Sequence, residues 1–190
     1  MRRRFGPCNS SRHPVKHLLR PGGGSDTREQ MSFTLGATAS WTKKDFFPAE
    51  CLGGGIKPDL VVAQIEIHKY VVETMITTAG KAGINFCLSA VPASRINRHL
   101  YKHLTHLLVN ESEAAIMSGS DRGEVNQNTW LAIAKEFLLR GVTNVVIRLG
   151  AEGAFYANQD GSGHCPAFDV NVKDTTGSGY VLSRWAYHMF

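Results

Sequence analysis

Asn110 and Glu113 stand out first, because an amide and a carboxylate at this spacing could organise a phosphate group, a water molecule or Mg²⁺. They directly follow the apolar run 107–109, which is typical of a buried strand. In parallel α/β sheets the ligand lies beyond the carboxyl ends of the strands, so both side chains could face it. The same pair also fits a capping box, in which two side chains satisfy free backbone donors at the start of a helix. From the residues alone, both uses stay open.

A second candidate is the run Asp174–Gly179, DTTGSG, which precedes a helical stretch containing Val181 and Trp185. Its small residues let several backbone N–H groups point at one anion, and the helix dipole adds to the attraction. The run therefore predicts a phosphate cradle, although glycine-rich turns before helices are also common. It is not a complete GxGxxG motif, and the chain contains no GxxxxGK motif of a P-loop.

Two further groups of residues have a plainer interpretation. Gly150 and Gly153 follow an apolar run and predict a tight turn into a returning strand. His99, His103 and His106 fall at helical spacing, which could suggest a metal site. We reject that interpretation, because no carboxylate or cysteine joins them at ligand spacing.

The elements that must position these residues alternate between short apolar runs and amphipathic segments. This alternation predicts an α/β fold with a mostly parallel sheet. We expect the first strand to be buried on both faces, and Gly83 and Gly141 to end helices. The expected strands are 60–67, 84–89, 107–109, 145–149 and 153–157, and the expected helices cover 71–82, 96–104, a segment from 110 onward and 127–139.

Composition limits the class of protein. The chain has 190 residues, of which 43% are apolar and 19% charged, which fits one ordinary soluble domain and excludes collagen, coiled coil and wholesale disorder. No stretch approaches the roughly 18 consecutive apolar residues of a membrane span, so we expect no membrane partner. Cys8, Cys51, Cys87 and Cys165 are widely spaced, and we expect them to be reduced. We expect a cytoplasmic location, with a nuclear or mitochondrial one left open.

The net charge of +5 belongs to one end of the chain. Six of the 21 basic residues precede the first acidic residue, Asp26, which leaves 15 basic and 16 acidic side chains and a net charge of −1 for residues 26–190. Residues 1–30 are predicted to be a disordered basic tail, or alternatively an organelle presequence, and residues 31–190 to be the folded domain. Nucleic-acid binding through the tail ranks last among the functions considered.

Taken together, the motifs and their order resemble the ribokinase (PfkB) family of sugar and nucleoside kinases. The resemblance covers about residues 33–188. Several segments are similar to family motifs: Leu35–Ala39 to PGANA, Gln64–Glu66 to QLE, Ser89–Ala93 to NPAPA, Val109–Ala114 to PNETEA, Val146–Gly153 to VITLGxxG, and Asp174–Gly179 to DTTGAG. The resemblance implies a three-layer, Rossmann-like ribokinase fold, incomplete at both ends of this chain.

The family transfers a phosphoryl group from ATP·Mg²⁺ to a sugar hydroxyl, so the resemblance implies a ribose-like sugar and ATP as partners. It also implies Mg²⁺ and a monovalent cation, for which K⁺ is the candidate. By the same resemblance Glu66 would contact the sugar, and Asn110, Gly150 and Gly153 would bind the nucleotide. Glu113 would order Mg²⁺, and Asp174 and Thr176 would lie at the cation site. Gly177, Ser178 and Gly179 would form the anion hole for the transferring phosphoryl group.

Departures from the family pattern bear on activity. The family's general base is the Asp that ends GAGD, and Tyr180 stands at that position here. A phenol with a pKa near 10 is protonated at pH 7 and cannot readily take a proton from the sugar. Arg148 stands where the family has Thr. The family's N-terminal sugar-binding half and its last elements have no counterpart in the chain. We therefore expect lost or severely reduced kinase activity. The alternative is a non-catalytic nucleotide-binding or interaction module that forms an oligomer through its incomplete sheet.

Overall fold

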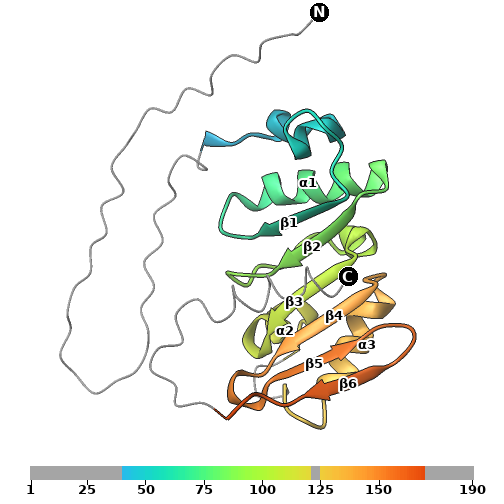
Figure 1. Cartoon of the computed structure of the whole chain (residues 1–190). Helices are drawn as coiled ribbons and strands as arrows, with labels where there is room; N and C mark the ends of the chain where they lie inside the picture. Colours follow the sequence, from blue (N-terminus) through green and yellow to red (C-terminus); the bar gives the residue numbers. More distant parts are fainter. Residues whose placement is uncertain (1–39, 121–124, 170–190) are drawn as a thin grey trace, which may run out of the picture. The chain divides into compact units, whose positions relative to one another are not determined.

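The computed structural model describes residues 40–120 and 125–169 (Figure 1). All its helices and strands belong to the compact unit Thr42–Phe190, while the unit Met1–Trp41 lies almost wholly outside the described residues. The strands are β1 (Leu60–Gln64), β2 (Asn85–Ser89), β3 (His106–Asn110), β4 (Asn144–Arg148), β5 (Ala154–Ala157) and β6 (Ser162–Cys165). The helices are α1 (Lys69–Ala82), α2 (Glu111–Ser118) and α3 (Trp130–Leu139), with 3₁₀ turns η2 (Lys43–Phe46), η3 (Ala49–Gly53), η4 (Arg98–His103) and η6 (Gly150–Glu152).

The six strands form one sheet in which each strand pairs with its neighbour in the sequence, in the order β1 to β6 (Figure 1). The pairs β1–β2, β2–β3 and β3–β4 are parallel, and the pairs β4–β5 and β5–β6 are antiparallel hairpins. The expected α/β fold is therefore confirmed. Parallel strands need a crossover between them, and these are supplied by α1, by η4, and by α2 with α3.

The core lies on one face of the sheet. The register of the strands places the apolar side chains of the core beside one another, for example Ala63 beside Leu88 and Ile147 beside Phe155. The cluster continues into the helices, where apolar residues at helical spacing meet the sheet. Its strand members are Val61, Ala63, Phe86, Leu88, Leu107, Val109, Val145, Ile147, Phe155 and Ala157. Burial of apolar surface in such a cluster is the main favourable contribution to folding.

The second face of the sheet is buried only over its middle strands. Cys87 of β2 and Leu108 of β3 are almost completely buried, whereas Val62 of β1 is 42% exposed and Tyr156 of β5 is 50% exposed. The expectation that the first strand is buried on both faces is therefore wrong. Val61 and Ala63 of β1 belong to the core cluster, whereas Val62 points to the opposite face of the sheet, which is partly open at this strand.

Helix α1 forms where its pattern predicts. Its apolar side chains fall on one stripe and are buried, and Gly83 ends the helix with a φ of 64°. This left-handed conformation suits glycine, and the Gly83 N–H donates to the Ala79 and Gly80 carbonyls. The apolar stripe and the local signal for the end of this helix therefore agree with the tertiary packing.

Several boundaries differ from the sequence expectations. β1 ends at Gln64 instead of residue 67, because the chain bends there and the Ile65 N–H donates to the Val91 carbonyl at 2.8 Å. The short helix expected over 96–104 is the 3₁₀ turn η4, and β6 was not expected at all. The predicted tail, the expected boundary at residue 30 and the run 174–180 lie outside the described residues.

Candidate active site at the carboxyl edge of the sheet

Four polar residues end the four parallel strands: Gln64 on β1, Ser89 on β2, Asn110 on β3 and Arg148 on β4. Register pairs Gln64 with Ser89, and Asn110 with Arg148. Because parallel strands run in the same direction, these residues share one edge of the sheet. This edge is where α/β proteins bind ligands, so it is the candidate site.

Asn110 and Glu113 form the capping box that their spacing allows. The Asn110 side chain accepts a hydrogen bond from the Glu113 N–H at 2.7 Å. In return, Glu113 Oε2 accepts from the Asn110 N–H at 2.7 Å, and Glu113 Oε1 accepts from Asn110 Nδ2 at 3.0 Å. The pair thus satisfies backbone donors that the first turn of α2 would otherwise leave free. The same contacts hold both side chains at the carboxyl edge.

Glu113 also forms an ion pair with Arg148, whose Nη2 lies 3.0 Å from Glu113 Oε2. The side chains are only 7% and 13% exposed, respectively. Burial raises the pKa of Glu113, and the Asn110 N–H and the Arg148 guanidinium oppose that shift. The pairing was missed in the sequence because the two residues are 35 positions apart. It depends on the register that sets Asn110 beside Arg148.

The surroundings of Glu113 do not fit a directly bound Mg²⁺ ion. Oε2 already accepts two hydrogen bonds and Oε1 one, and a guanidinium already balances the charge. Mg²⁺ demands near-octahedral oxygen ligands at about 2.0–2.1 Å. Within 40–120 and 125–169, no cluster of three or more His, Cys, Asp or Glu side chains could hold a metal. The role of Glu113 toward Mg²⁺ stays a prediction, as do those of Asp174 and Thr176, which lie outside these ranges.

Ser89 adds an unusual group to this edge. Its side chain is 1% exposed, and its Oγ has no hydrogen-bond partner among the described residues. Buried hydroxyls are usually paired, so each exception needs a reason. The residue ends β2 at the candidate site. A hydroxyl can both donate and accept a hydrogen bond, and in this structure that capacity of Ser89 is unused among the described residues.

Gly150 and Gly153 form the turn between β4 and β5, as the hairpin interpretation expected. The Leu149 N–H donates to the Gly153 carbonyl at 2.8 Å. Gly153 has a φ of 96° and a ψ of −126°, and a Cβ at this position would lie 2.1 Å from the Cys165 carbonyl oxygen. Only glycine fits here. Their expected contact with a nucleotide stays a prediction.

Glu66 stands apart from this cluster. It lies two residues beyond the end of β1, it is exposed, and it makes no hydrogen bond or ion pair with another described residue. Its expected contact with a sugar stays a prediction. The anion-hole residues Gly177, Ser178 and Gly179, and Tyr180 at the base position, lie outside the described residues.

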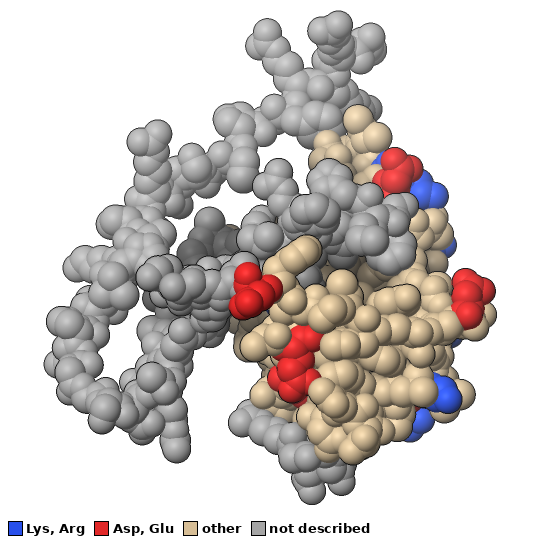
Figure 2. All heavy atoms as spheres, turned by 60° about the horizontal axis from the view of Figure 1, so that its bottom comes forward, with Lys and Arg blue, Asp and Glu red and all other residues tan. Residues whose placement is uncertain are grey.

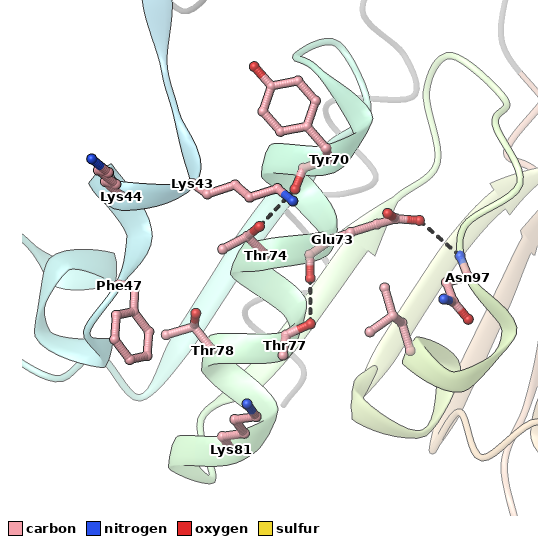
Figure 3. Close-up of a pocket in the computed structure, with 11 residues that line it drawn as sticks. Lys43, Lys44, Phe47, Tyr70, Glu73, Thr74, Thr77, Thr78, Lys81 and Asn97 are labelled. Atoms are coloured by element: carbon pink, nitrogen blue, oxygen red, sulfur yellow. Dashed lines mark hydrogen bonds between the residues drawn. The ribbon is translucent and has the colours of Figure 1, made fainter.

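A hollow with a volume of about 490 Å³ lies beside α1, away from the carboxyl edge (Figure 3). Tyr70, Thr74 and Lys81 line it from α1, while Lys43 and Phe47 line it from the segment around η2. The Thr74 hydroxyl donates to the Tyr70 carbonyl at 2.8 Å, so it is engaged within the helix. None of the residues predicted from the sequence lines this hollow. The polar side chains predicted from the sequence converge at the carboxyl edge instead.

Charge on the surface is mixed. In the view of Figure 2, acidic side chains are spread over the described surface, and basic side chains lie at its margin without forming a continuous stripe. Among the described residues, no helix is both long enough and apolar enough to cross a bilayer.

The fold gathers polar residues at the edge of the sheet where α/β proteins bind ligands, and comparison with known proteins identifies the family. Residues 26–179 match the pfkB family of carbohydrate kinases. The chain belongs to this family. The resemblance seen in the sequence motifs is thereby confirmed.

Individual relatives agree with this assignment. The chain is 31% identical to the ribokinase of Staphylococcus aureus over 144 residues, which are 76% of this chain and 46% of the relative. It is 35% identical to a bifunctional ribokinase/ribose-5-phosphate isomerase A of Fructilactobacillus sanfranciscensis, over 65% of this chain and 23% of the relative. The ribokinase structure from Thermotoga maritima superposes with a TM-score of 0.66 at 27% identity, covering 80% of this chain and 49% of that one. The chain thus spans less than half the length of these relatives.

A structure of Arabidopsis thaliana ribokinase complexed with ribose and ATP shares the fold, with a TM-score of 0.62 at 21% identity over 70% of this chain and 43% of that one. The fold is therefore that of the ribokinases, and the six strands described above are part of it.

Proposed function

We propose that this chain carries the phosphate-binding part of an ATP-dependent carbohydrate kinase, which transfers a phosphoryl group from ATP to a hydroxyl of a ribose-type sugar. The observation that carries the proposal is the cluster of Asn110, Glu113 and Arg148 at the carboxyl edge of the sheet, within the region that matches the family. The relatives named as ribokinases, and the Arabidopsis ribokinase bound to ribose and ATP, support the substrate class.

In this proposal each predicted residue has one task. Asn110, Gly150 and Gly153 contact the nucleotide, and Glu66 contacts the sugar. Glu113 lies beside the phosphates, where Arg148 balances its charge. Mg²⁺ enters with ATP, as in other kinases, and shields the charge of its phosphates. The run 174–179 would supply backbone N–H groups to the transferring phosphoryl group and would hold a monovalent cation such as K⁺ through Asp174 and Thr176.

Tyr180 is the residue that argues for reduced turnover. Loss of a general base typically costs about 10²–10⁴ in rate. The test is ADP release by the purified chain with ATP·Mg²⁺ and ribose, compared with a blank without sugar. We expect little sugar-dependent release from the native chain and an increase of at least tenfold for Tyr180→Asp. Tyr180→Phe is the matched control and should give no increase.

The outcomes separate the parts of this proposal. Rapid ribose-dependent release by the native chain would show that Tyr180 does not limit turnover. No release by either chain, together with no binding of ATP, would contradict the kinase proposal itself.

The same tyrosine favours one alternative, a non-catalytic nucleotide-binding or interaction module. Such a module would bind ATP without sugar-dependent ADP release. ATP at 100 times its Kd would then stabilise the folded chain by about 2.7 kcal/mol, which a thermal unfolding experiment detects. An oligomer formed through the β1 edge, where Val62 is exposed, would elute early in size-exclusion chromatography. Tyr180→Asp would leave a pure binding module without activity.

A further inference from the structure

The family resemblance assigns Glu113 to Mg²⁺, but in this structure the group beside the Glu113 carboxylate is Arg148. Its guanidinium contacts Glu113 at 3.0 Å, and both side chains are largely buried. We propose that Arg148 takes the place of a divalent cation at Glu113, so that this chain binds nucleotide phosphate without a Mg²⁺ ion ordered by that carboxylate. The inference rests on the proposed nucleotide site.

Charge balance is the first argument. Glu113 carries one negative charge, and the guanidinium supplies one positive charge within hydrogen-bond distance. A divalent ion placed at the same carboxylate would meet the arginine as a like charge in a poorly solvated region, where such repulsion is strong. It would also have to displace the Asn110 N–H or the guanidinium from Oε2. The carboxylate is thus already engaged by a cation of the protein itself.

The remaining donors of Arg148 are the second argument. Only Nη2 contacts Glu113, and Nε is completely buried without a hydrogen-bond partner among the described residues. Unpaired buried donors are rare in folded proteins. Arginine is well suited to phosphate, because its planar fork can donate two parallel hydrogen bonds to one group. The guanidinium can therefore hold Glu113 with one nitrogen and an anion with another.

The competing interpretation is purely structural: the ion pair fastens the start of α2 to the end of β4. Both interpretations predict that loss of Arg148 destabilises the protein, because it leaves Glu113 buried and unpaired. They differ in the effect of Mg²⁺. If the ion pair is only structural, the Mg²⁺ dependence of the ATP affinity should be the same in the native chain and in a variant without Arg148.

The first experiment measures the affinity of the full chain for ATP by calorimetry, in Mg²⁺ and in EDTA. We expect the native affinity to change less than threefold between the two conditions. Arg148→Thr should bind at least tenfold more weakly in EDTA and recover most of that loss in Mg²⁺. Arg148→Lys keeps the positive charge beside Glu113 but lacks the planar fork, so it should bind ATP more weakly than the native chain while its affinity still changes less than threefold between EDTA and Mg²⁺. Arg98→Thr makes the same change at an exposed arginine of η4 and is the matched control. A native affinity that falls tenfold or more in EDTA overturns the proposal.

A second experiment does not depend on nucleotide binding. Mn²⁺ binding to the chain alone is measured by electron paramagnetic resonance. We expect no binding to the native chain at millimolar Mn²⁺, and binding to Arg148→Thr that the added change Glu113→Gln removes. Binding to the native chain that Glu113→Gln abolishes would overturn the proposal, and so would an absence of binding to Arg148→Thr.

A double-mutant cycle covers variants that fold poorly. The free energy of unfolding in urea is measured for Arg148→Gln, for Glu113→Gln and for the double variant. If the two single changes in this free energy add up to that of the double variant, the two side chains do not interact, which would contradict the pairing. If no form binds ATP, the proposed function fails, while Mn²⁺ binding and the cycle still decide the inference about Arg148.

Discussion

The turn between β4 and β5 offers a direct test of how tightly this end of the sheet is packed. Replacing Gly153 by Ala would place a Cβ 2.1 Å from the Cys165 carbonyl oxygen and 2.6 Å from the Ala167 nitrogen. Both are backbone atoms, so no side-chain rotation relieves the overlap, and the segment after β6 must move away. A positive φ costs a residue with a Cβ about 1–2 kcal/mol, and overpacking of this kind adds about 1–3 kcal/mol. We therefore expect Gly153→Ala to lower the free energy of unfolding by about 3 kcal/mol.

Gly150 supplies the control within the same turn. Its φ is also positive, at 56°, but no atom lies within 4 Å of the position that a Cβ would take. Gly150→Ala should therefore cost only the backbone strain, about 1 kcal/mol. The difference between the two variants, about 2 kcal/mol, isolates the steric contribution of the approach of Cys165. Both glycines are also predicted nucleotide contacts. Because the unfolding is measured without nucleotide, the difference between the two variants concerns folding alone.

Urea unfolding followed by tryptophan fluorescence is a suitable assay. Of the three tryptophans of the chain, Trp130 has its ring 5.3 Å from the His164 ring of β6 and 6.1 Å from the Phe155 ring of β5, so the Trp130 part of the emission reports on both strands. For a chain of this size, about 3 kcal/mol corresponds to a decrease in Tm of about 6–12 °C. Equal urea midpoints for the two glycine variants would refute the reasoning, since they would show that Cys165 does not constrain the turn.

Three further predictions concern the helices and the sheet. Gly80→Ala should destabilise the protein although alanine favours helices, because its Cβ would lie 2.3 Å from the His103 ring. In a His103→Gly background, which also removes the His103 Cβ that would lie 2.7 Å away, urea unfolding should show the opposite sign, a gain of up to about 1 kcal/mol. Arg140→Ala should cost about 2–3 kcal/mol in urea unfolding, because the Arg140 guanidinium donates to two carbonyls at the end of α2, at 2.8 and 2.6 Å. Burial lowers the pKa of His106. Below about pH 6.5 the unfolded chain therefore takes up a proton that the folded chain does not, and stability should fall on acidification. His106→Gln should weaken this pH dependence, and an unchanged profile would contradict the assignment.

Much of the sheet could be predicted because its signals are local. Alternating strands and helices, the glycine that ends α1 and the capping box at Asn110 each depend on residues a few positions apart. Such signals are fixed by backbone geometry and by hydrogen bonds along one segment. The family motifs are likewise contiguous. For this reason the amino-acid sequence alone predicts both the fold class and the pairing of Asn110 with Glu113.

The remaining features depend on long-range contacts. The bond between Glu113 and Arg148 needs the register of β3 with β4, which no local pattern encodes. β6 has the sequence SGHC, which carries almost no strand signal, and it forms because β5 offers it an edge of unpaired backbone groups. The one-sided exposure of β1 depends on which face of the sheet the core cluster covers, and only Val61 and Ala63 meet that cluster. Tertiary context decided each of these features.

The sequential order of the strands also bears on how the chain reaches its native state. Each strand pairs with the one that precedes it, and the separation between partners is 25 residues for Leu60 and Asn85, 38 for His106 and Asn144, and five for Ala157 and Ser162. During synthesis a nascent chain with this order can add one strand at a time to a surface that already exists, with no strand inserted later between two others. Such growth keeps loop-closure entropy low at each step and leaves a single growing edge exposed at that end.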